Sequence, residues 1–171
     1  MYKNLLIISL SVALSYAESG YCEYGVHQHG VAEFSIAWSK QEIALDLHTP
    51  AQNVLGFEHS PKTDKEKQYV AERLAALKNA EQLFSFDAKA GCALRSVDSE
   101  SPFEVQPTHT EIEVSYHYHC QQPQYLKGID TQGLFKQFPG FEILNAQWIT
   151  DKQQSAKSLN KNDTYIDFSP R

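Results

Sequence analysis

Two pairs of histidines occur in the pattern His-x-His. His27 and His29 form the first pair, and His117 and His119 form the second. Residues two apart on a β-strand point to one face with Cα atoms about 6.6 Å apart, so two imidazoles can converge on one Zn²⁺ through bonds of about 2.0–2.1 Å. Each pair is therefore a candidate metal site, and the two pairs could complete one site if their strands lie close together. The alternative interpretation is that these histidines are exposed on solvated strands.

The second pair belongs to the segment THTEIEVSYHYHC, residues 108–120, which separates polar from apolar side chains. The apolar side chains occupy every second position, at Ile112, Val114, Tyr116, Tyr118 and Cys120. The positions between and before them include the polar residues His109, Glu111, Glu113, His117 and His119. Because successive side chains of a strand point to opposite faces, the segment predicts a strand with one buried face. Its other face displays imidazoles and carboxylates, which makes His109 a further candidate ligand.

The first pair opens a stretch, residues 27–50, whose alternation is typical of a β-hairpin. The inward positions are Ala32, Phe34, Ile36 and Trp38, then Ile43, Leu45 and Leu47, with a turn at residues 39–42. If Trp38 faces Ile43, the same antiparallel register sets Phe34 against Leu47. It also sets Glu33 against His48 on the reverse side, which carries His27, His29, Glu33, Asp46 and His48. Glu33 and His48 are therefore candidate ligands as well.

The segment VLGFEHSP, residues 54–61, places another histidine in a predicted loop before a helix. In a functional interpretation, His59 is a metal ligand or hydrogen-bond donor and Glu58 orients it. In a structural interpretation, Phe57 anchors the loop in the core and His59 bonds to backbone carbonyls. The residues alone favour the structural interpretation.

Ligand chemistry narrows the choice of metal. Cu(I) prefers thioether and thiolate ligands, but Met1 is the only methionine and two of the three cysteines are expected to be oxidised. Imidazole together with carboxylate points to zinc, while Cu(II) and Ni(II) stay open as alternatives. We find no nucleophile elbow, phosphate-binding glycine loop or His-Glu-x-x-His motif, so we expect no enzyme, with a zinc hydrolase as the less favoured alternative.

The remaining pattern predicts an α+β fold: a mainly antiparallel sheet packed against one long helix, with a short second helix. Thr63 and Glu66 have the spacing of a capping box, and apolar residues from Val70 to Phe84 recur at helical spacing, which predicts a helix of about five to six turns. The short helix falls in GLFKQFP. Further strands are expected at residues 141–150 and 164–168, and the polar residues 95–107 are expected to form a loop.

The amino terminus has the features of a secretory signal peptide over residues 1–17. Lys3 precedes the apolar run LLIISLSVAL, and small residues flank Tyr16 at the end of the segment. No later stretch approaches the roughly 20 apolar residues of a membrane helix, so we expect no membrane insertion of the mature chain. Residues 18–171 are then expected to form a single exported metal-binding domain.

The net charge indicates which kinds of partner the protein can bind, and the cysteines indicate whether a disulfide is expected. With 15 basic and 21 acidic residues the formal net charge is −6, which disfavours nucleic acid as a partner and suits cations. In an oxidising compartment two of the cysteines Cys22, Cys92 and Cys120 are expected to pair. Cys120 lies on the apolar parity of its strand and Cys92 opens another apolar run, so Cys92–Cys120 is favoured among the three possible bridges.

Several segments, taken in order, resemble the ZrgA-type zinc-uptake proteins of the bacterial periplasm. They are HQHGVAEFSIAW, HTPAQNVLGFEHSP, LFSFDAKAGC, the strand ending at Cys120, and GLFKQFPGFEILNAQW, and together they span residues 27–149. The resemblance implies a periplasmic zinc-binding protein that works beside an inner-membrane zinc transporter when the metal is scarce. The family's His-x-His-Gly pattern falls on His27, His29 and Gly30, its Gly-Phe-Glu-His pattern on residues 56–59, and its paired cysteines on Cys92 and Cys120. The resemblance thus adds weight to a functional role for His59.

One departure from the family changes the expectation for metal capacity. Members usually carry a long tract rich in histidine and acidic residues between the two cysteines, whereas residues 93–107 contain no histidine. His109, His117 and His119 therefore become more important as candidate ligands, and we do not expect the protein to bind many zinc ions. Our hypothesis is zinc capture for uptake, and its rival is a structural or interaction protein of the cell envelope with solvated histidines.

Overall fold

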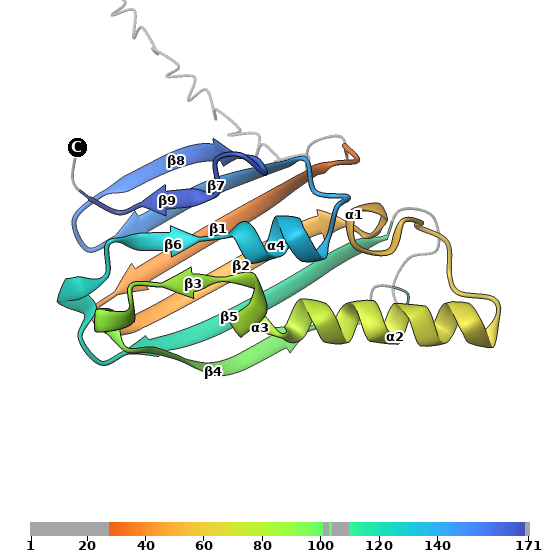
Figure 1. Ribbon diagram of the computed structural model, residues 1–171, viewed down its shortest axis with the longest axis horizontal. Coiled ribbons are helices and arrows are strands. Elements are labelled where there is room, and N and C mark those ends of the chain that lie inside the picture. The colour runs from red at the N-terminus through yellow and green to blue at the C-terminus, as the bar shows by residue number, and fades with distance from the viewer. Residues whose placement is uncertain (1–27, 101–102, 104–109, 170–171) are drawn as a thin grey trace, which may run out of the picture.

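A six-stranded mixed sheet forms the base of the fold, and a layer of helices with a small second sheet covers one of its sides (Figure 1). The computed structural model describes residues 28–100, 103 and 110–169. The strand order is β4-β5-β2-β1-β7-β8, with β1 parallel to β7 and the other neighbours antiparallel. The bounds are β1 (Val31–Ser39), β2 (Glu42–Pro50), β4 (Cys92–Ser99), β5 (Glu111–Cys120), β7 (Ile143–Thr150) and β8 (Gln154–Leu159).

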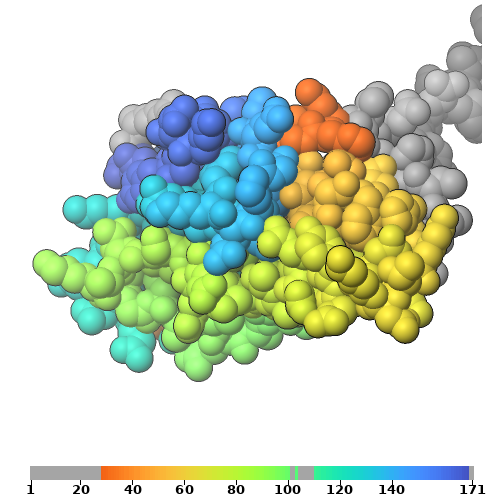
Figure 2. All heavy atoms as spheres, turned by 45° about the vertical axis from the view of Figure 1, so that its right-hand side comes forward, coloured from red at the N-terminus to blue at the C-terminus, as the bar shows by residue number. Residues whose placement is uncertain are grey.

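The covering layer combines short helices with a three-stranded sheet of order β3-β6-β9. Its elements are α1 (Ala51–Leu55), α2 (Asp64–Lys78), α3 (Ala80–Leu83), β3 (Ser85–Phe86), η1 (Ala88–Ala90), η2 (Pro123–Tyr125), β6 (Gly128–Asp130), α4 (Gln132–Gln137) and β9 (Tyr165–Asp167). Figure 2 shows the gold α1 segment, the yellow α2 and the light-blue α4 adjoining on the surface. Arg73 of α2 joins them, because its guanidinium donates to the carbonyls of Val54 and Gln137 and lies 4.3 Å from the Phe138 ring centroid.

The hydrophobic core lies between these two layers. Alternate residues of β1, β2, β5 and β7 are buried, as expected of strands with one covered face. The Phe84 ring stacks on Phe34 at 5.3 Å and meets Tyr116 edge-on at 5.1 Å. The Tyr116 hydroxyl donates to the Leu77 carbonyl, and burial raises the pKa of this phenol above its ordinary value. The apolar parity predicted for residues 112–120 is confirmed.

The register of the predicted hairpin is confirmed, but β1 begins only at Val31. His29 therefore lies in a turn before the strand and not on its polar face, and His27 lies outside the described residues. Trp38 pairs with Ile43, Phe34 with Leu47 and Glu33 with His48. Lys40 occupies the turn with a φ of 54°, a left-handed conformation that a tight two-residue connection requires. The strand predicted at residues 141–150 and the terminal strand are confirmed as β7 and β9, and the short helix in GLFKQFP as α4.

The predicted α+β fold with one long helix is wrong, because the described chain is mostly β and its large sheet is mixed. The capping box of Thr63 and Glu66 is present, and backbone hydrogen bonds from Thr63 and Lys62 lower the pKa of Glu66. The helix ends at Lys78, however, because Asn79 takes the non-helical angles φ −80° and ψ 70°. The next turn, α3, restarts the helical spacing, which is why the pattern looked continuous.

The prediction of a loop over residues 95–107 is also wrong for residues 95–99, which belong to strand β4. This strand pairs with β5 from Cys92 to Ser99, and its register shifts between Leu94 and Ser96. The extra residue at such a bulge reverses the parity of the side chains that follow it. The alternation that would have predicted a strand is therefore interrupted.

The predicted disulfide between Cys92 and Cys120 is present and closes a sequence separation of 28 residues. It links directly paired residues of β4 and β5. Cys22 and the predicted signal peptide, residues 1–17, lie outside the described residues. Within the described ranges, no helix combines the length and apolar character needed to cross a bilayer.

Candidate metal-binding face

The predicted ligands gather on the side of the six-stranded sheet that points away from the covering layer. We call this surface the open face, and its polar residues include Glu33, Glu42, Asp46, His48, Glu111, Glu113, His117 and His119. Backbone pairing sets these residues in rows across the strands. One row contains Glu33, His48 and Glu113, and another, closer to the hairpin turn, contains Ser39, Glu42 and His119.

His48 stands between two carboxylates at the end of β2. Its Nε2 lies 3.4 Å from Oε2 of Glu111 and 3.4 Å from Oε1 of Glu113. Glu111 and Glu113 point to the same face because they are two residues apart on β5. The side chains of His48 and Glu111 are largely buried, with 27% and 18% exposed, while that of Glu113 is 69% exposed. We call these three residues the His48 group.

Glu33 lies in the same row, but its carboxylate points toward β7 and away from His48. Its Oε1 accepts a hydrogen bond of 3.0 Å from the Asn145 side chain on β7. Asn145 in turn accepts from the Ser158 hydroxyl on β8. Glu33 is therefore engaged with the β7–β8 half of the sheet, although the register places it beside His48.

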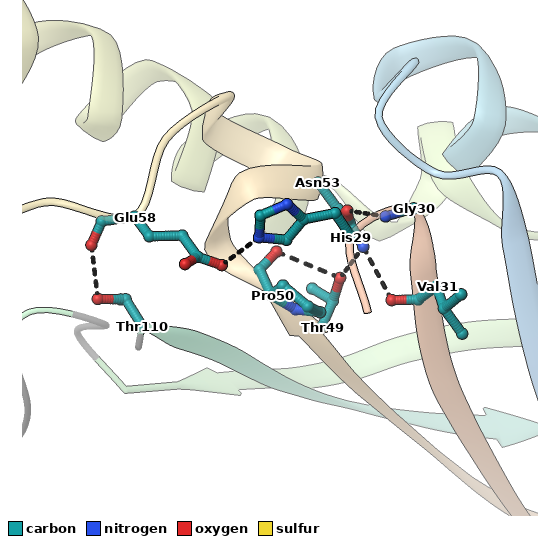
Figure 3. A network of polar contacts seen from close by, with 8 residues as sticks. All are labelled: His29, Gly30, Val31, Thr49, Pro50, Asn53, Glu58 and Thr110. Carbon is teal, nitrogen blue, oxygen red and sulfur yellow. Dashed lines mark hydrogen bonds and ion pairs between the residues drawn. The ribbon is translucent and has the colours of Figure 1, made fainter. Parts of the chain in front are cut away.

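His29 contacts a carboxylate at the same end of the sheet as the His48 group (Figure 3). Its Nε2 lies 3.0 Å from Oε1 of Glu58, and the Glu58 carbonyl accepts a hydrogen bond from Thr110, the residue before Glu111. The His29 side chain is 61% exposed. Glu58 thus brings the loop after α1 to the start of both β1 and β5.

The buried Asn53 of α1 fixes the backbone that carries His29. Its Oδ1 accepts from the Gly30 amide at 2.7 Å, and its Nδ2 donates to the Val31 carbonyl and to the Thr49 hydroxyl (Figure 3). Gly30 has a φ of 86°, which disfavours a side chain there. One amide side chain therefore ties the start of β1 to the end of β2.

His119 and His117 lie at the opposite end of the open face, near the hairpin turn. Nδ1 of His119 lies 2.6 Å from Oε1 of Glu42, its cross-strand neighbour on β2. A carboxylate can only accept here, so Nδ1 carries the proton and Nε2 is left with a lone pair when the ring is neutral. Metal-binding histidines are commonly held in this way by a carboxylate. We call Glu42, His117 and His119 the His119 group.

His59 is held by its own loop. Its ring stacks on Phe57 with centroids 4.6 Å apart, and Nδ1 donates to the Ser60 carbonyl at 3.1 Å. Phe57 in turn packs against the edge of the core. These contacts are those of the structural interpretation, and they do not bring His59 to either group on the open face.

His29 and the pair His117/His119 lie at opposite ends of the six-stranded sheet. Glu42 and His48 are six positions apart on β2, which is about 20 Å at the rise of a strand, and His29 lies at the His48 end. His27 and His109 lie outside the described residues. Within the described part of the chain, no three His, Cys, Asp or Glu side chains are already arranged as a metal cage.

Three carboxylates were missed as site residues from the sequence alone: Glu42, Glu111 and Glu113. The parity of residues 108–120 had placed Glu111 and Glu113 on the histidine face. Their contact with His48 depends on the pairing of β2 with β5, which sequence alternation does not specify. Glu42 pairs with His119 through the same strand contact.

The fold and this face define a class of protein: a mostly β, two-layer domain that presents imidazole and carboxylate groups, both ligands of divalent metals, on one side of a sheet. The model of the ZrgA family of zinc uptake proteins matches residues 26–168, and the chain belongs to this family. Membership assigns the protein a role in zinc uptake. No curated protein matches the chain.

Proposed function

We propose that the protein captures zinc in the periplasm and passes it to an inner-membrane zinc transporter. Family membership supports the zinc part of this proposal, and the signal-peptide features of residues 1–17 support export. The observation that carries a site on this chain is the position of His48 Nε2, 3.4 Å from a carboxylate oxygen of both Glu111 and Glu113.

These separations suit a tetrahedral zinc ion. With zinc–ligand bonds of about 2.0–2.2 Å, two ligands of a tetrahedron lie about 3.3–3.6 Å apart. The His48 contacts therefore have the length of two edges of such a tetrahedron. We propose that rotation of the exposed Glu113 side chain brings the three donor atoms around one ion, since the described residues are not arranged as a cage without it.

An imidazole with two carboxylates also suits a carrier. Three protein ligands leave the fourth zinc position open to water or to a ligand of a partner protein. A partner can thus begin to bind the ion before the carrier has released it. Membership in a zinc uptake family supports such a binding role.

The His119 group is a second candidate zinc site. Glu42 holds the Nδ1 proton of His119, so Nε2 can bind a metal, and His117 projects from the same face two residues away. His29 and Glu58 add donors beside the His48 group. His27, His109, Glu33 and His59 stay as proposed ligands from the sequence.

Calorimetric titration of the purified protein with zinc tests the site directly. We expect His48→Ala and Glu113→Gln each to weaken zinc binding by about tenfold or more, because each removes one ligand. Asp98→Asn is the matched control, since it removes an exposed carboxylate from the neighbouring strand β4 and should leave the affinity within about twofold. If the His48 and Asp98 variants bind zinc equally well, the His48 group is not the site.

A companion titration separates the two candidate sites. A His117→Ala/His119→Ala variant should lose a second zinc equivalent and keep the first if both groups bind. If this variant loses all binding while His48→Ala loses none, zinc is held at the His119 group alone. A deletion strain that grows normally under strong zinc limitation would contradict the uptake role and favour a structural protein of the envelope.

A further inference from the structure

A pocket of about 360 Å³ lies at the hairpin end of the sheet, away from the His48 group. It forms where the β1–β2 turn, the β7–β8 turn, the segment after η2 and the residues after β9 meet, at the left end of the sheet in Figure 1. Its volume lies within the usual range for sites that bind small molecules, about 300–1,000 Å³. None of the predicted metal ligands lines it.

Four of the residues that line this pocket are apolar or aromatic. Trp38, Phe168, Leu126 and Pro123 line it, and the Trp38 and Phe168 rings have centroids 5.6 Å apart. The Trp38 indole N–H donates to the Lys40 carbonyl at 3.1 Å. Its hydrogen-bonding group is therefore already engaged, and the ring offers an apolar surface to a ligand.

The charged residues that line the pocket are mostly basic, although the chain as a whole has a formal net charge of −6. Lys40, Lys127 and Lys152 line the pocket, and no ion pair holds any of their ammonium groups within the described residues. The single carboxylate, Asp151, is used by the turn: its oxygens accept from the Lys40 amide and the Ser39 hydroxyl. These hydrogen bonds lower the pKa of Asp151, so it is ionised near neutral pH. Three cations against one anion leave a local excess of positive charge.

We propose that this pocket binds a small organic anion, a carboxylate with an aromatic or apolar body. The body packs against Trp38 and Phe168, while the carboxylate lies among the lysine ammonium groups that line the pocket. Aromatic walls with convergent charged groups provide both burial and orientation for such a ligand. This site is separate from the proposed zinc sites and does not depend on zinc binding.

Phenylacetate is a suitable probe because it joins one ring to one carboxylate. The measurement is an NMR titration of the purified protein in metal-free buffer, which follows the Trp38 indole N–H and the amides of residues 150–153. We expect saturable binding with a dissociation constant of about 0.1–5 mM, as is usual for so small a ligand. Phenylacetamide, which has the same shape without the charge, should bind at least about fivefold more weakly.

Two further measurements test whether the three lysines that line the pocket bind the carboxylate. The Lys40→Gln/Lys127→Gln/Lys152→Gln variant should bind phenylacetate about tenfold more weakly, while the control Lys65→Gln, exposed on α2, should bind like the parent. If the triple variant does not fold, raising the salt concentration of the parent sample from about 0.05 M to about 0.5 M should weaken binding several-fold. Equal binding of acid and amide, salt-independent binding, or no shift at Trp38 would overturn the proposal.

Discussion

Imidazoles face carboxylates at three places in the structure. His48, His119 and His29 each lie within 3.4 Å of a glutamate oxygen. Two of these contacts are made across paired strands, and the third bridges a loop and the start of β1. A protonated histidine gains an ion pair at such a position, whereas a zinc ion requires the neutral ring. Protons and zinc therefore compete for the same groups.

This competition predicts a pH dependence of zinc binding. Lowering the pH from about 7.5 to about 5.5 should weaken binding by at least tenfold, because the histidine ligands must lose their protons to bind the metal. Calorimetry at both pH values, in buffers of matched ionisation enthalpy, measures the change. An affinity that does not change near pH 5.5 would indicate binding by carboxylates alone.

The side chain of Asn53 should contribute to the stability of the fold. Its side chain is buried and makes three hydrogen bonds, to Gly30, Val31 and Thr49. Asn53→Ala should lower the free energy of unfolding by about 2–4 kcal/mol, because buried backbone groups lose their partners. Urea denaturation measures this loss, with Asn145→Ala on the open face as the control. A loss below about 1 kcal/mol would mean that water or a backbone shift replaces these bonds.

Local alternation predicted the first two strands of the large sheet and the faces of β5. It placed the β1–β2 hairpin in its true register and assigned the faces of β5. It failed at β4, where the shift after Leu94 interrupts the pattern, and at Asn79, where α2 ends although apolar residues continue at helical spacing. The contacts of His48 with Glu111 and Glu113 needed knowledge of which strands are neighbours, which local spacing does not contain.

The disulfide allows a prediction about the pair β4 and β5. Cys92→Ala/Cys120→Ala should lower the free energy of unfolding by about 3–4 kcal/mol, because the unfolded chain is no longer cross-linked over 28 residues. Urea denaturation of the oxidised protein and of the double variant gives the difference. A reductant should destabilise the parent and leave the double variant unchanged. Similar stability of both proteins would show that the β4–β5 pairing needs no cross-link.

Zinc should stabilise the folded protein against unfolding. The proposed ligands of the His48 group come from β2 and β5, which are brought together only by folding. A zinc concentration of 100 times the dissociation constant should therefore add about 2.7 kcal/mol to the free energy of unfolding. Thermal unfolding with and without zinc measures this as a rise in midpoint, and magnesium at the same concentration is the control. Equal midpoints would indicate that zinc binds the unfolded chain as well as the folded one.

The parallel contact between β1 and β7 has a consequence for how the chain reaches its native state. β1 lies in the interior of the sheet, yet one of its two neighbours is a strand whose facing residues, such as Glu33 and Asn145, are 112 positions apart. Distant pairings of this kind raise the contact order and slow folding, since a long loop must close first. Until β7 has been synthesised and docked, β1 presents an unprotected edge rich in apolar residues, the kind of surface to which chaperones and other unfolded chains bind.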